Sequence, residues 1–485
     1  MQGDHIYVLS SNVRLRNDGI KCLIYRVDDF FNAVDNITII PSKTAVLLAL
    51  FDGKKSLKDI AVLYTYLASL DQNEDDAIKH VKKVIKALED NFKDKIIVEK
   101  KDDVYYPTYN PEEIIVQGDV EHSCPYDMRL SIPLSVNFNV STVCGFNCIY
   151  CYHPLDPVFP YLSIERVRQL AKELKEGGCE SVMLTGGDPF MRPDLIDVMK
   201  AFYDVGLFYS LSTKSILSRD VIKRMVTECG LDRIQLSFDS CKPEILSKMI
   251  GVKESYFYDF VKMVDILHEF NVDVRLKAVL TAFNCDELKT FLEFCHKRLG
   301  VNNIQVVQYG RSGTRHTEEL FPSEKQLEEA TNELNKFRSE YPNCIVQGGG
   351  FSIAYHECIE LKENEPFFAH RSICNAGRFS LTILPNGEVT VCEQLPYNKK
   401  YIIGDLKNKS LNDFWSGDSI TNWLTPPARE YYPIESACRT CDEDKYDLCH
   451  TRYSRCLRFI WETFGNTDQP DINCPECQFD RIRIT

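Results

Sequence analysis

The sequence predicts an α/β protein of several domains. At 485 residues, the chain is too long for a single ordinary core. Between residues 131 and 320, short apolar runs of strand character alternate with helical patterns, which is typical of a parallel sheet with crossover helices. The residues before this region follow a different pattern, and the last third is rich in cysteine. We therefore expect a central parallel sheet between two smaller domains.

Composition excludes several classes of protein. The chain has twenty cysteines but no signal-like apolar start, which argues against a secreted disulfide scaffold. No apolar run approaches the roughly 18 residues that a membrane span needs. The formal charge of −14 disfavours nucleic acid as the main partner. We expect a reduced, cytoplasmic protein that binds neither membrane nor nucleic acid.

Residues 1–105 predict a small α+β module. The turn Asn17-Asp18-Gly19 is a good hairpin signal, and we expect it to join the two strands that flank it. Ser56 and Asp59 have capping-box spacing at a helix start. The expected elements are strands Ile6–Leu9 and Cys22–Val27, helices from Ser42, Ser56 and Glu74, and a closing strand Lys95–Glu99.

The alternating region should supply the central sheet. Three prolines in residues 106–130 predict a linker that leads into it. Six strands are expected: Leu134–Val140, Ser181–Thr185, Phe208–Leu211, Arg233–Phe238, Val272–Leu280 and Asn303–Val307. In barrels of parallel strands the chemistry lies at the carboxyl ends of the strands. Polar residues that follow these runs are therefore the first candidates for a site.

Cys144, Cys148 and Cys151 follow the first of these strands with the spacing C-x3-C-x2-C. Three thiolates this close can bind three corners of a four-iron cluster and leave the fourth iron open for a small ligand. A structural zinc site is the alternative. Zinc usually takes four ligands, however, often as two C-x2-C pairs.

A second group of cysteines fills the last third. Cys374, Gly387 and Cys392 form C-x12-G-x4-C, with Pro385-Asn386-Gly387 as a hairpin turn between them. Six more cysteines follow, at positions Cys438, Cys441, Cys449, Cys456, Cys474 and Cys477. Eight cysteines in about a hundred residues of a reduced protein predict bound metal. The two C-x2-C pairs keep zinc open as an alternative here.

The first cysteine motif, with the aromatic Tyr150 directly before its last cysteine, resembles the radical S-adenosylmethionine (radical SAM) superfamily. The resemblance implies a partial (β/α)6 barrel, a 4Fe-4S cluster on Cys144, Cys148 and Cys151, and S-adenosyl-L-methionine as cofactor. It also implies reductive cleavage of that cofactor, which yields a 5′-deoxyadenosyl radical that abstracts hydrogen from an unreactive carbon. An electron donor such as flavodoxin or ferredoxin is implied as a partner.

The same resemblance implies the cofactor contacts. Gly186-Gly187-Asp188-Pro189 is similar to the family's G-G-E-P, and Ser237 to Ser240 to its S-x-D-G. Thr213-Lys214-Ser215 departs from the family's T-N-G, so we assign it no role. The implied contacts are Tyr150, Gly186, Gly187, Asp188, Ser237, Asp239, Arg275 and Asn284.

The last third resembles the SPASM domain, which holds auxiliary iron–sulfur clusters in radical SAM enzymes that modify peptides and proteins. The resemblance implies one auxiliary cluster on Cys374, Cys392 and Cys456, with Cys358 as candidate fourth ligand. A second cluster is implied on Cys438, Cys441, Cys449 and Cys477, with Cys474 as the alternative to Cys477. The spacings around Cys449 and Cys456 are longer than the family's.

The first module resembles the RiPP recognition element, a winged-helix module that binds leader peptides. Pro41 to Lys43, Leu50 to Gly53 and the helix start Leu57 to Ile60 carry the resemblance. It implies that an extended leader adds as a strand to a sheet edge. DNA binding is the alternative, but the charges of residues 1–110 nearly cancel, whereas DNA requires a basic face.

Together these resemblances predict a radical SAM maturase of a ribosomally made precursor peptide, an oxidoreductase that forms a thioether or a carbon–carbon crosslink. The expected parts are a leader-binding module (1–105), a linker (106–130), the barrel (131–320), a bridging region (321–372) and the SPASM domain (373–485). Two alternatives stand beside this reading. One is a sulfatase-type maturase that forms formylglycine, and the other is a metal-binding winged-helix regulator without enzymatic activity.

Overall fold

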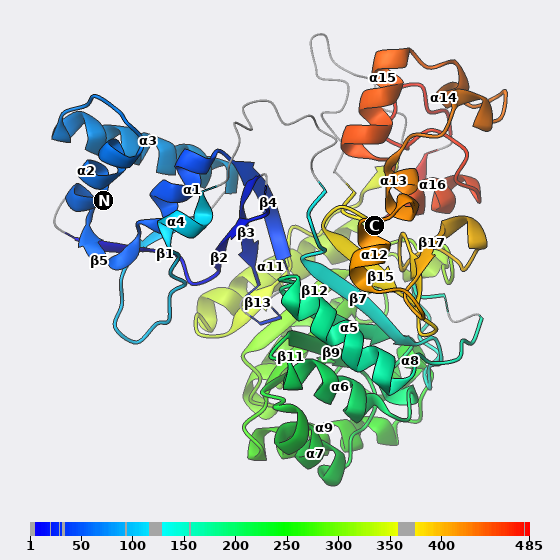
Figure 1. Cartoon of the computed structure of the whole chain (residues 1–485). Helices are drawn as coiled ribbons and strands as arrows, with labels where there is room; N and C mark the ends of the chain where they lie inside the picture. The colour runs from blue at the N-terminus through cyan, green and yellow to red at the C-terminus, as the bar shows by residue number, and fades with distance from the viewer. Residues whose placement is uncertain are drawn as a thin grey trace. The chain divides into compact units, whose positions relative to one another are not determined.

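The computed structural model describes residues 5–19, 21–28, 30–31, 34–92, 95–115, 129–154, 157–356, 374–479 and 481–485. The chain folds into two compact units, Met1–Leu134 and Ser135–Thr485, and each is described by itself (Figure 1). In the described part of the chain we find no helix with the length and apolar character that a bilayer span requires.

The first unit has two three-stranded antiparallel sheets. One is a meander of β2 (Val13–Asn17), β3 (Cys22–Val27) and β4 (Val34–Ile40). The other has β1 (Ile6–Leu9) at its centre, between β5 (Asp52–Ser56) and β6 (Ile97–Glu99). The expected hairpin turn forms, but the strand that it joins to β3 is β2, with Asn17 opposite Cys22. The expected pairing with Ile6–Leu9 is therefore wrong, because the residues next to the turn pair first.

Helices α1 (Ser42–Ala49), α2 (Leu57–Leu67), α3 (Glu74–Phe92) and α4 (Pro111–Ile114) complete this unit. The expected capping box begins α2, since the Ser56 hydroxyl accepts from the Asp59 amide and the Asp59 carboxylate accepts from the Ser56 amide. On α3, Val81 and Ile85 are buried one turn apart in the core of the unit, as their helical spacing predicts. The winged-helix resemblance of this unit stays a prediction.

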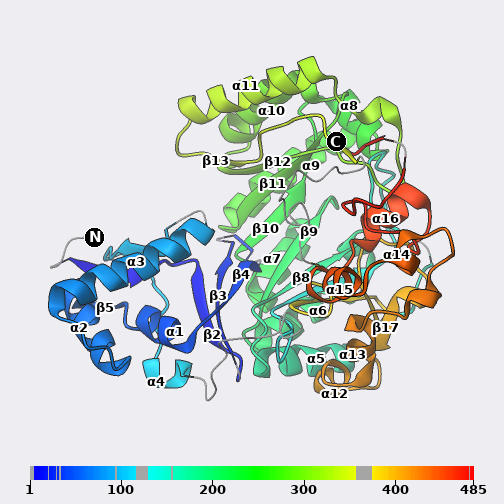
Figure 2. The same cartoon turned by 90° about the horizontal axis from the view of Figure 1, so that it is seen from above.

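The second unit is built on one ten-stranded sheet with the order β13-β12-β11-β10-β9-β8-β7-β15-β16-β17. All six expected strands form, within two residues of their expected ends, and neighbours among them pair in parallel. They are β7 (Ser135–Ser141), β8 (Ser181–Gly186), β9 (Phe208–Thr213), β10 (Arg233–Ser237), β11 (Asp273–Leu280) and β12 (Asn303–Gln308). Figure 2 shows β8 to β13 in this order, and β13 (Ile345–Gln347) adds in parallel beyond β12.

Side chains alternate across this sheet. On β7, Val136, Phe138 and Val140 are buried apolar residues, so Asn137 and Asn139 belong to the opposite, inner face. The helices of the crossovers are α5 (Ile164–Glu176), α6 (Leu195–Asp204), α7 (Arg219–Cys229), α8 (Pro243–Ile250), α9 (Ser255–Glu269), α10 (Leu288–Glu293) and α11 (Glu324–Glu340). The polar inner face and the carboxyl ends of the strands are thus the part of the fold that can hold a site.

The last third continues the same sheet. The expected hairpin forms as β15 (Ser380–Ile383) and β16 (Glu388–Thr390), followed by β17 (Ile402–Asp405). Unexpectedly, β15 pairs in parallel with β7, with Thr382 opposite Asn137. Five short helices follow: α12 (Leu411–Trp415), α13 (Asp418–Leu424), α14 (Ala437–Thr440), α15 (Glu443–Leu448) and α16 (Leu457–Phe464). Near the end of the chain, β18 (Ile482–Arg483) pairs antiparallel with the earlier strand β14 (Tyr355–His356).

Candidate active site

The three cysteines expected to hold the first cluster lie in the loop after β7. Their sulfur atoms are close enough to influence one another electrostatically. Burial raises the pKa of the Cys148 thiol to about 11, whereas the nearby Lys214 ammonium acts in the opposite direction. The structure therefore gathers Cys144, Cys148 and Cys151 at the carboxyl end of a central strand.

The cysteine loop is fixed by the end of α8 and by the loop that follows β12. The amides of Asn147 and Ile149 donate to carbonyls at the end of α8, each at 3.0 Å. From the other side, Arg315 donates to the Asn147 side chain at 2.9 Å and to the Cys148 carbonyl at 3.0 Å. Thr314 donates to the Cys151 carbonyl at 2.9 Å. These hydrogen bonds hold the thiols in place without using the sulfur atoms.

Gly186 and Gly187 lie against the backbone of the same loop. The Gly187 amide donates to the Ser141 carbonyl at 2.7 Å, and the Asp188 amide donates to the Val143 carbonyl at 3.0 Å. A Cβ on Gly187 would overlap the Val143 carbonyl, and Gly186 has a φ of +139°. Only glycine allows so close an approach with this backbone, so the glycine pair has a structural reason beyond any cofactor contact.

The carboxylate of Asp188 is held by Thr213, the last residue of β9, and by the two residues that follow it. Its carboxylate accepts from the Thr213 hydroxyl at 2.8 Å, the Lys214 amide at 3.1 Å and the Ser215 hydroxyl at 2.9 Å. The sequence assigned no role to this triplet because it departs from the family motif. Its role is to fix Asp188. The signal that could have revealed it is the pair of hydroxyl residues at a strand end, which suits a buried carboxylate.

Asp239, just after β10, is the second buried carboxylate of the site. It accepts a short hydrogen bond from the Tyr150 hydroxyl and another from the Val279 amide at 2.9 Å. The Nζ atom of Lys214 lies 3.8 Å from its Oδ2 and 5.6 Å from the centre of the Tyr150 ring. Burial alone would lower the pKa of Lys214, but Asp239 and the thiols of Cys148 and Cys151 raise it. The lysine is therefore a cation beside the cysteine loop.

A cavity of about 600 Å³ brings together the cysteines expected to hold the first auxiliary cluster. Cys374, Cys392 and Cys456 all line it. Burial raises the pKa of Cys392 to about 11 and of Cys456 to about 12; the charge of Cys374 adds to both shifts, and that of Cys392 adds to the shift of Cys456. Asn137 of the inner sheet face lines the cavity too. The candidate fourth ligand, Cys358, lies outside the described residues.

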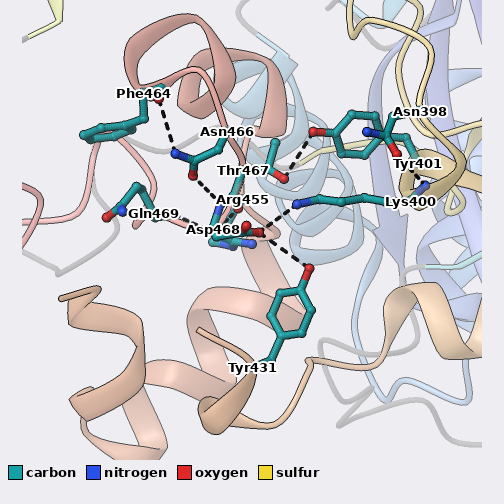
Figure 3. A network of polar contacts seen from close by, with 10 residues as sticks. All are labelled: Asn398, Lys400, Tyr401, Tyr431, Arg455, Phe464, Asn466, Thr467, Asp468 and Gln469. Atoms are coloured by element: carbon teal, nitrogen blue, oxygen red, sulfur yellow. Dashed lines mark hydrogen bonds and ion pairs between the residues drawn. The ribbon is translucent and has the colours of Figure 1, made fainter. Parts of the chain in front are cut away.

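One wall of this cavity is a polar network that joins the chain before β17 to the chain after α16 (Figure 3). Lys400 donates to Asp468 at 2.8 Å, and the Tyr431 hydroxyl points at the same carboxylate. Arg455 donates to the Gln469 carbonyl at 2.6 Å. The network fixes the segment that carries Cys456 relative to the hairpin that carries Cys392.

The remaining cysteines form another group. Cys438, Cys441 and Cys449 lie near one another at α14 and α15, and their charges, with burial, raise the pKa of Cys474 to about 12. Cys474 thus lies beside the other three. Cys477 is fully buried, and its amide donates to the Cys474 carbonyl at 2.9 Å, so both occupy one short turn. Which of the two serves as ligand stays a prediction.

Comparison with known protein families agrees with this arrangement. The model of the radical SAM superfamily matches residues 138–298. The model of SPASM, an iron–sulfur cluster-binding domain, matches residues 374–442. This chain contains a radical SAM domain and a SPASM domain. A regulator without enzymatic activity would have no use for the former, so that alternative is set aside.

Relatives and solved structures cover most of the chain. The PqqA peptide cyclase of Rhizobium meliloti (strain 1021) is 24% identical over 326 residues, which are 66% of this chain and 82% of the relative. That of Granulibacter bethesdensis is 23% identical over 357 residues, or 71% and 87%. SuiB of Streptococcus suis, bound to S-adenosylmethionine, has a TM-score of 0.56 at 15% identity and covers 98% of this chain and 100% of its own. The likeness to SuiB shows that the fold is shared.

Within the radical SAM domain, Asn284 uses its whole amide inside the protein. Its Oδ1 accepts from the Thr281 amide at 2.7 Å and from the Thr281 hydroxyl at 3.0 Å. Its Nδ2 donates to the carbonyls of Asp239 at 2.6 Å and Val279 at 3.0 Å. In this structure Asn284 therefore ties the loop after β11 to Asp239. Ser237 lies half-buried at the end of β10, opposite Lys277.

Arg275 lies deeper in the radical SAM domain than expected. It is opposite Gln235 and Asn303 in the sheet and donates to the Asn303 side chain at 2.9 Å. Alternate residues of β11 share its face, so Lys277 and Val279 both lie nearer the carboxyl end. The structure thus places Arg275 a layer below the group formed by Asp188, Asp239 and the cysteines.

The residues fit an iron–sulfur cluster and S-adenosylmethionine. Among the described residues, no group of three or more His, Cys, Asp or Glu side chains closes around a single metal ion. The three thiols of the first loop instead lie near Lys214 and the carboxylates of Asp188 and Asp239. In addition, Asn139 Oδ1 is buried without a hydrogen-bond partner, next to Gly186. A buried oxygen without a partner is costly, so this atom suits a wall that a bound molecule completes.

Proposed function

We propose that this protein is a radical SAM maturase that crosslinks a ribosomally made precursor peptide. The observation that carries the proposal is that residues beside the two cysteine groups lie close enough to interact electrostatically. Lys277 interacts electrostatically with Lys214 and Asp239 of the first group and with Glu393, which follows Cys392 of the auxiliary group. Tyr152, next to Cys151, also feels the charges of Glu393 and Cys392. A peptide segment between the two groups would meet both.

The peptide-cyclase relatives support a peptide as substrate, and the presence of both domains supports oxidative chemistry. When bound, the cluster and S-adenosylmethionine supply a 5′-deoxyadenosyl radical that abstracts a hydrogen atom from a carbon of the peptide. The task of this chain is to position the reactants and to exclude water. Tyr150, Asp239 and Lys214 would orient the cofactor, whereas Lys277 and Glu393 would line the path to the substrate.

We further propose that the first unit binds the leader of this peptide. Strand β4 is an edge strand of the β2-β3-β4 sheet, seven residues long. Beside it, Asn91 of α3 donates to the Thr38 hydroxyl at 3.4 Å. An extended leader could pair with this edge through backbone hydrogen bonds, with α3 as the neighbouring surface. SuiB bound to the precursor peptide SuiA shares the fold over 96% of this chain, with a TM-score of 0.57.

We also propose the cellular compartment of the protein and the class of protein that donates its electron. All eighteen cysteines that the structure describes are free thiols, which supports a reduced, cytoplasmic protein. Reductive cleavage of S-adenosylmethionine requires one electron, which is released again when the crosslink closes, so we propose a flavodoxin or ferredoxin as the donor that starts the reaction. The bond formed is a thioether from a cysteine sulfur to carbon, or a carbon–carbon bond.

An anaerobic experiment tests this function. The protein is reconstituted with iron and sulfide and reduced in the presence of S-adenosylmethionine and a candidate precursor peptide. We expect 5′-deoxyadenosine and a peptide that is lighter by two hydrogen atoms and resists fragmentation within a ring. The variant C144A/C148A/C151A should make neither product but keep its auxiliary iron. Formylglycine in a linear peptide would favour the sulfatase-type alternative, and bound zinc without deoxyadenosine would refute both.

A further inference from the structure

Lys214 is a nearly buried lysine that directly follows β9. Its side chain is only 14% exposed. Its backbone is held on both sides, since its amide donates to Asp188 at 3.1 Å and its carbonyl accepts from the Tyr256 hydroxyl at 2.6 Å. The base of the side chain is therefore fixed, and the ammonium extends toward Tyr150 and the cysteine loop.

Within the described residues, the Lys214 ammonium still has hydrogen-bond donors available. An ammonium carries three donors. Among the described residues, Asp239 Oδ2 is the carboxylate oxygen that lies within 4.0 Å of the Lys214 Nζ atom, and its distance of 3.8 Å is beyond hydrogen-bond length. That carboxylate already accepts from Tyr150 and Val279. Lys214 therefore faces the space beside the cysteines as a cation with donors available for an anionic ligand group.

The two other cations of the inner face are less well placed for such a group. Arg275 lies a layer deeper and donates to Asn303. Lys277 is nearer, but burial and the charge of Lys214 lower its pKa. At the level of Asp188 and Asp239, the described residues thus bring carboxylates together with Lys214. This pattern of charges complements a ligand that carries an ammonium and a carboxylate on one carbon.

We propose that Lys214 binds the carboxylate of S-adenosylmethionine and orients its methionine part beside Cys144, Cys148 and Cys151. The triplet Thr213-Lys214-Ser215 then has two functions, because its hydroxyls fix Asp188 and its ammonium holds the ligand. In this proposal the carboxylate is held by Lys214 and not by Arg275. The inference rests on the radical SAM domain and is independent of the peptide substrate.

The proposal can be tested by comparing two ligands that differ only in the carboxylate, on the wild type and on variants of Lys214. S-adenosylmethionine and its decarboxylated analogue are bound to the reconstituted, unreduced protein, and their dissociation constants are measured by equilibrium dialysis. We expect the wild type to prefer S-adenosylmethionine by about ten- to one-hundred-fold, as for a hydrogen bond to a charged group. K214M should bind both ligands equally, and about as weakly as the wild type binds the analogue. K214Q should also lose the preference, whereas K214R, which keeps the charge, should retain much of it.

R275M and K277M are the matched controls, because each removes one cation from the same inner face. Both should keep the wild-type preference for the carboxylated ligand. Iron per chain and the visible absorption of the cluster are measured for every variant, so that loss of the cluster is not mistaken for loss of a contact. A K214M or K214Q protein that loads iron and keeps the preference overturns the proposal, as does an R275M protein that loses it. Since no peptide is present, failure here is distinct from failure of the crosslinking function.

Discussion

Trp461 of α16 packs directly on Gly313. Gly313 lies in the loop after β12, which donates hydrogen bonds to the loop that contains the cysteines of the radical SAM domain. A Cβ on Gly313 would overlap the indole ring. Two residues later, Arg315 donates to the Cys148 carbonyl at 3.0 Å. Five residues, 311–315, therefore connect a helix of the last third to the first cysteine loop. The two cysteine groups are mechanically linked as well as near each other.

Replacing Gly313 with alanine should disturb this link. The new methyl group must displace the indole or the loop, and overpacking of this kind typically costs about 1–3 kcal/mol. We expect a lower unfolding temperature and a lower yield of 5′-deoxyadenosine per iron. G310A is the control in the same loop, since its Cβ would lie 3.4 Å from the Ile484 carbonyl, an ordinary contact. Equal stability of the two variants would argue against a tight contact at Gly313.

The substitution G187A should remove the first cluster selectively. Its Cβ would meet the backbone of Val143, which cannot move aside as a side chain can. The cysteine loop must then shift away from Asp188. We expect iron per chain to fall to the level of C144A/C148A/C151A, with auxiliary iron retained, as measured by iron analysis and low-temperature EPR. Full iron and normal spectra would show that the loop tolerates the change.

The hydroxyl of Thr213 should matter through Asp188. In T213V the carboxylate loses a hydrogen bond of 2.8 Å in a buried position, and such a loss typically costs about 1–3 kcal/mol. We expect weaker binding of S-adenosylmethionine, measured by equilibrium dialysis, together with lower stability. T227V is the control, because the Thr227 hydroxyl donates within the exposed surface of α7. If both variants bind the cofactor as the wild type does, Asp188 does not depend on Thr213.

The choice between Cys474 and Cys477 can be decided by counting iron. Because Cys474 lies beside Cys438, Cys441 and Cys449, we expect C474A to lose as much iron as C441A. C477A should lose less and instead show the instability of a truncated buried side chain. C344A, which removes a buried thiol far from both groups in sequence, controls for general damage. The opposite order of iron loss would assign the ligand to Cys477.

Local signals in the sequence predicted much of this molecule. The six parallel strands, the capping box at Ser56 and the grouping of Cys144, Cys148 and Cys151 all follow from spacing along the chain. Two features were missed for different reasons. The strand Val13–Asn17 lies next to the expected hairpin turn, but its two arginines hid its strand character. The pairing of Ser380–Ile383 with β7 joins segments some 245 residues apart and has no local signature.

For the candidate site, too, the sequence predicted some residues and missed others. The family resemblance named Asp188 and Asp239 as candidate contacts, but it gave no indication that Lys214 lies beside Asp239. Arg275 was expected to contact the cofactor from its strand, and strand register places it opposite Gln235, before Lys277 and Val279 along β11. Lys214 was passed over because its motif differs from the family's. Only the three-dimensional arrangement shows that the end of β9 reaches Asp239.

The ladder between β15 and β7 has a consequence for the evolution of such proteins. Because Thr382 and Asn137 face each other across neighbouring strands, the separation of the two cysteine groups is set by backbone hydrogen bonds and not by the length of the chain between them. Insertions or deletions in the connecting segment would leave the path for an electron unchanged. Lineages can therefore remodel that segment to suit new substrates while the redox geometry is inherited intact.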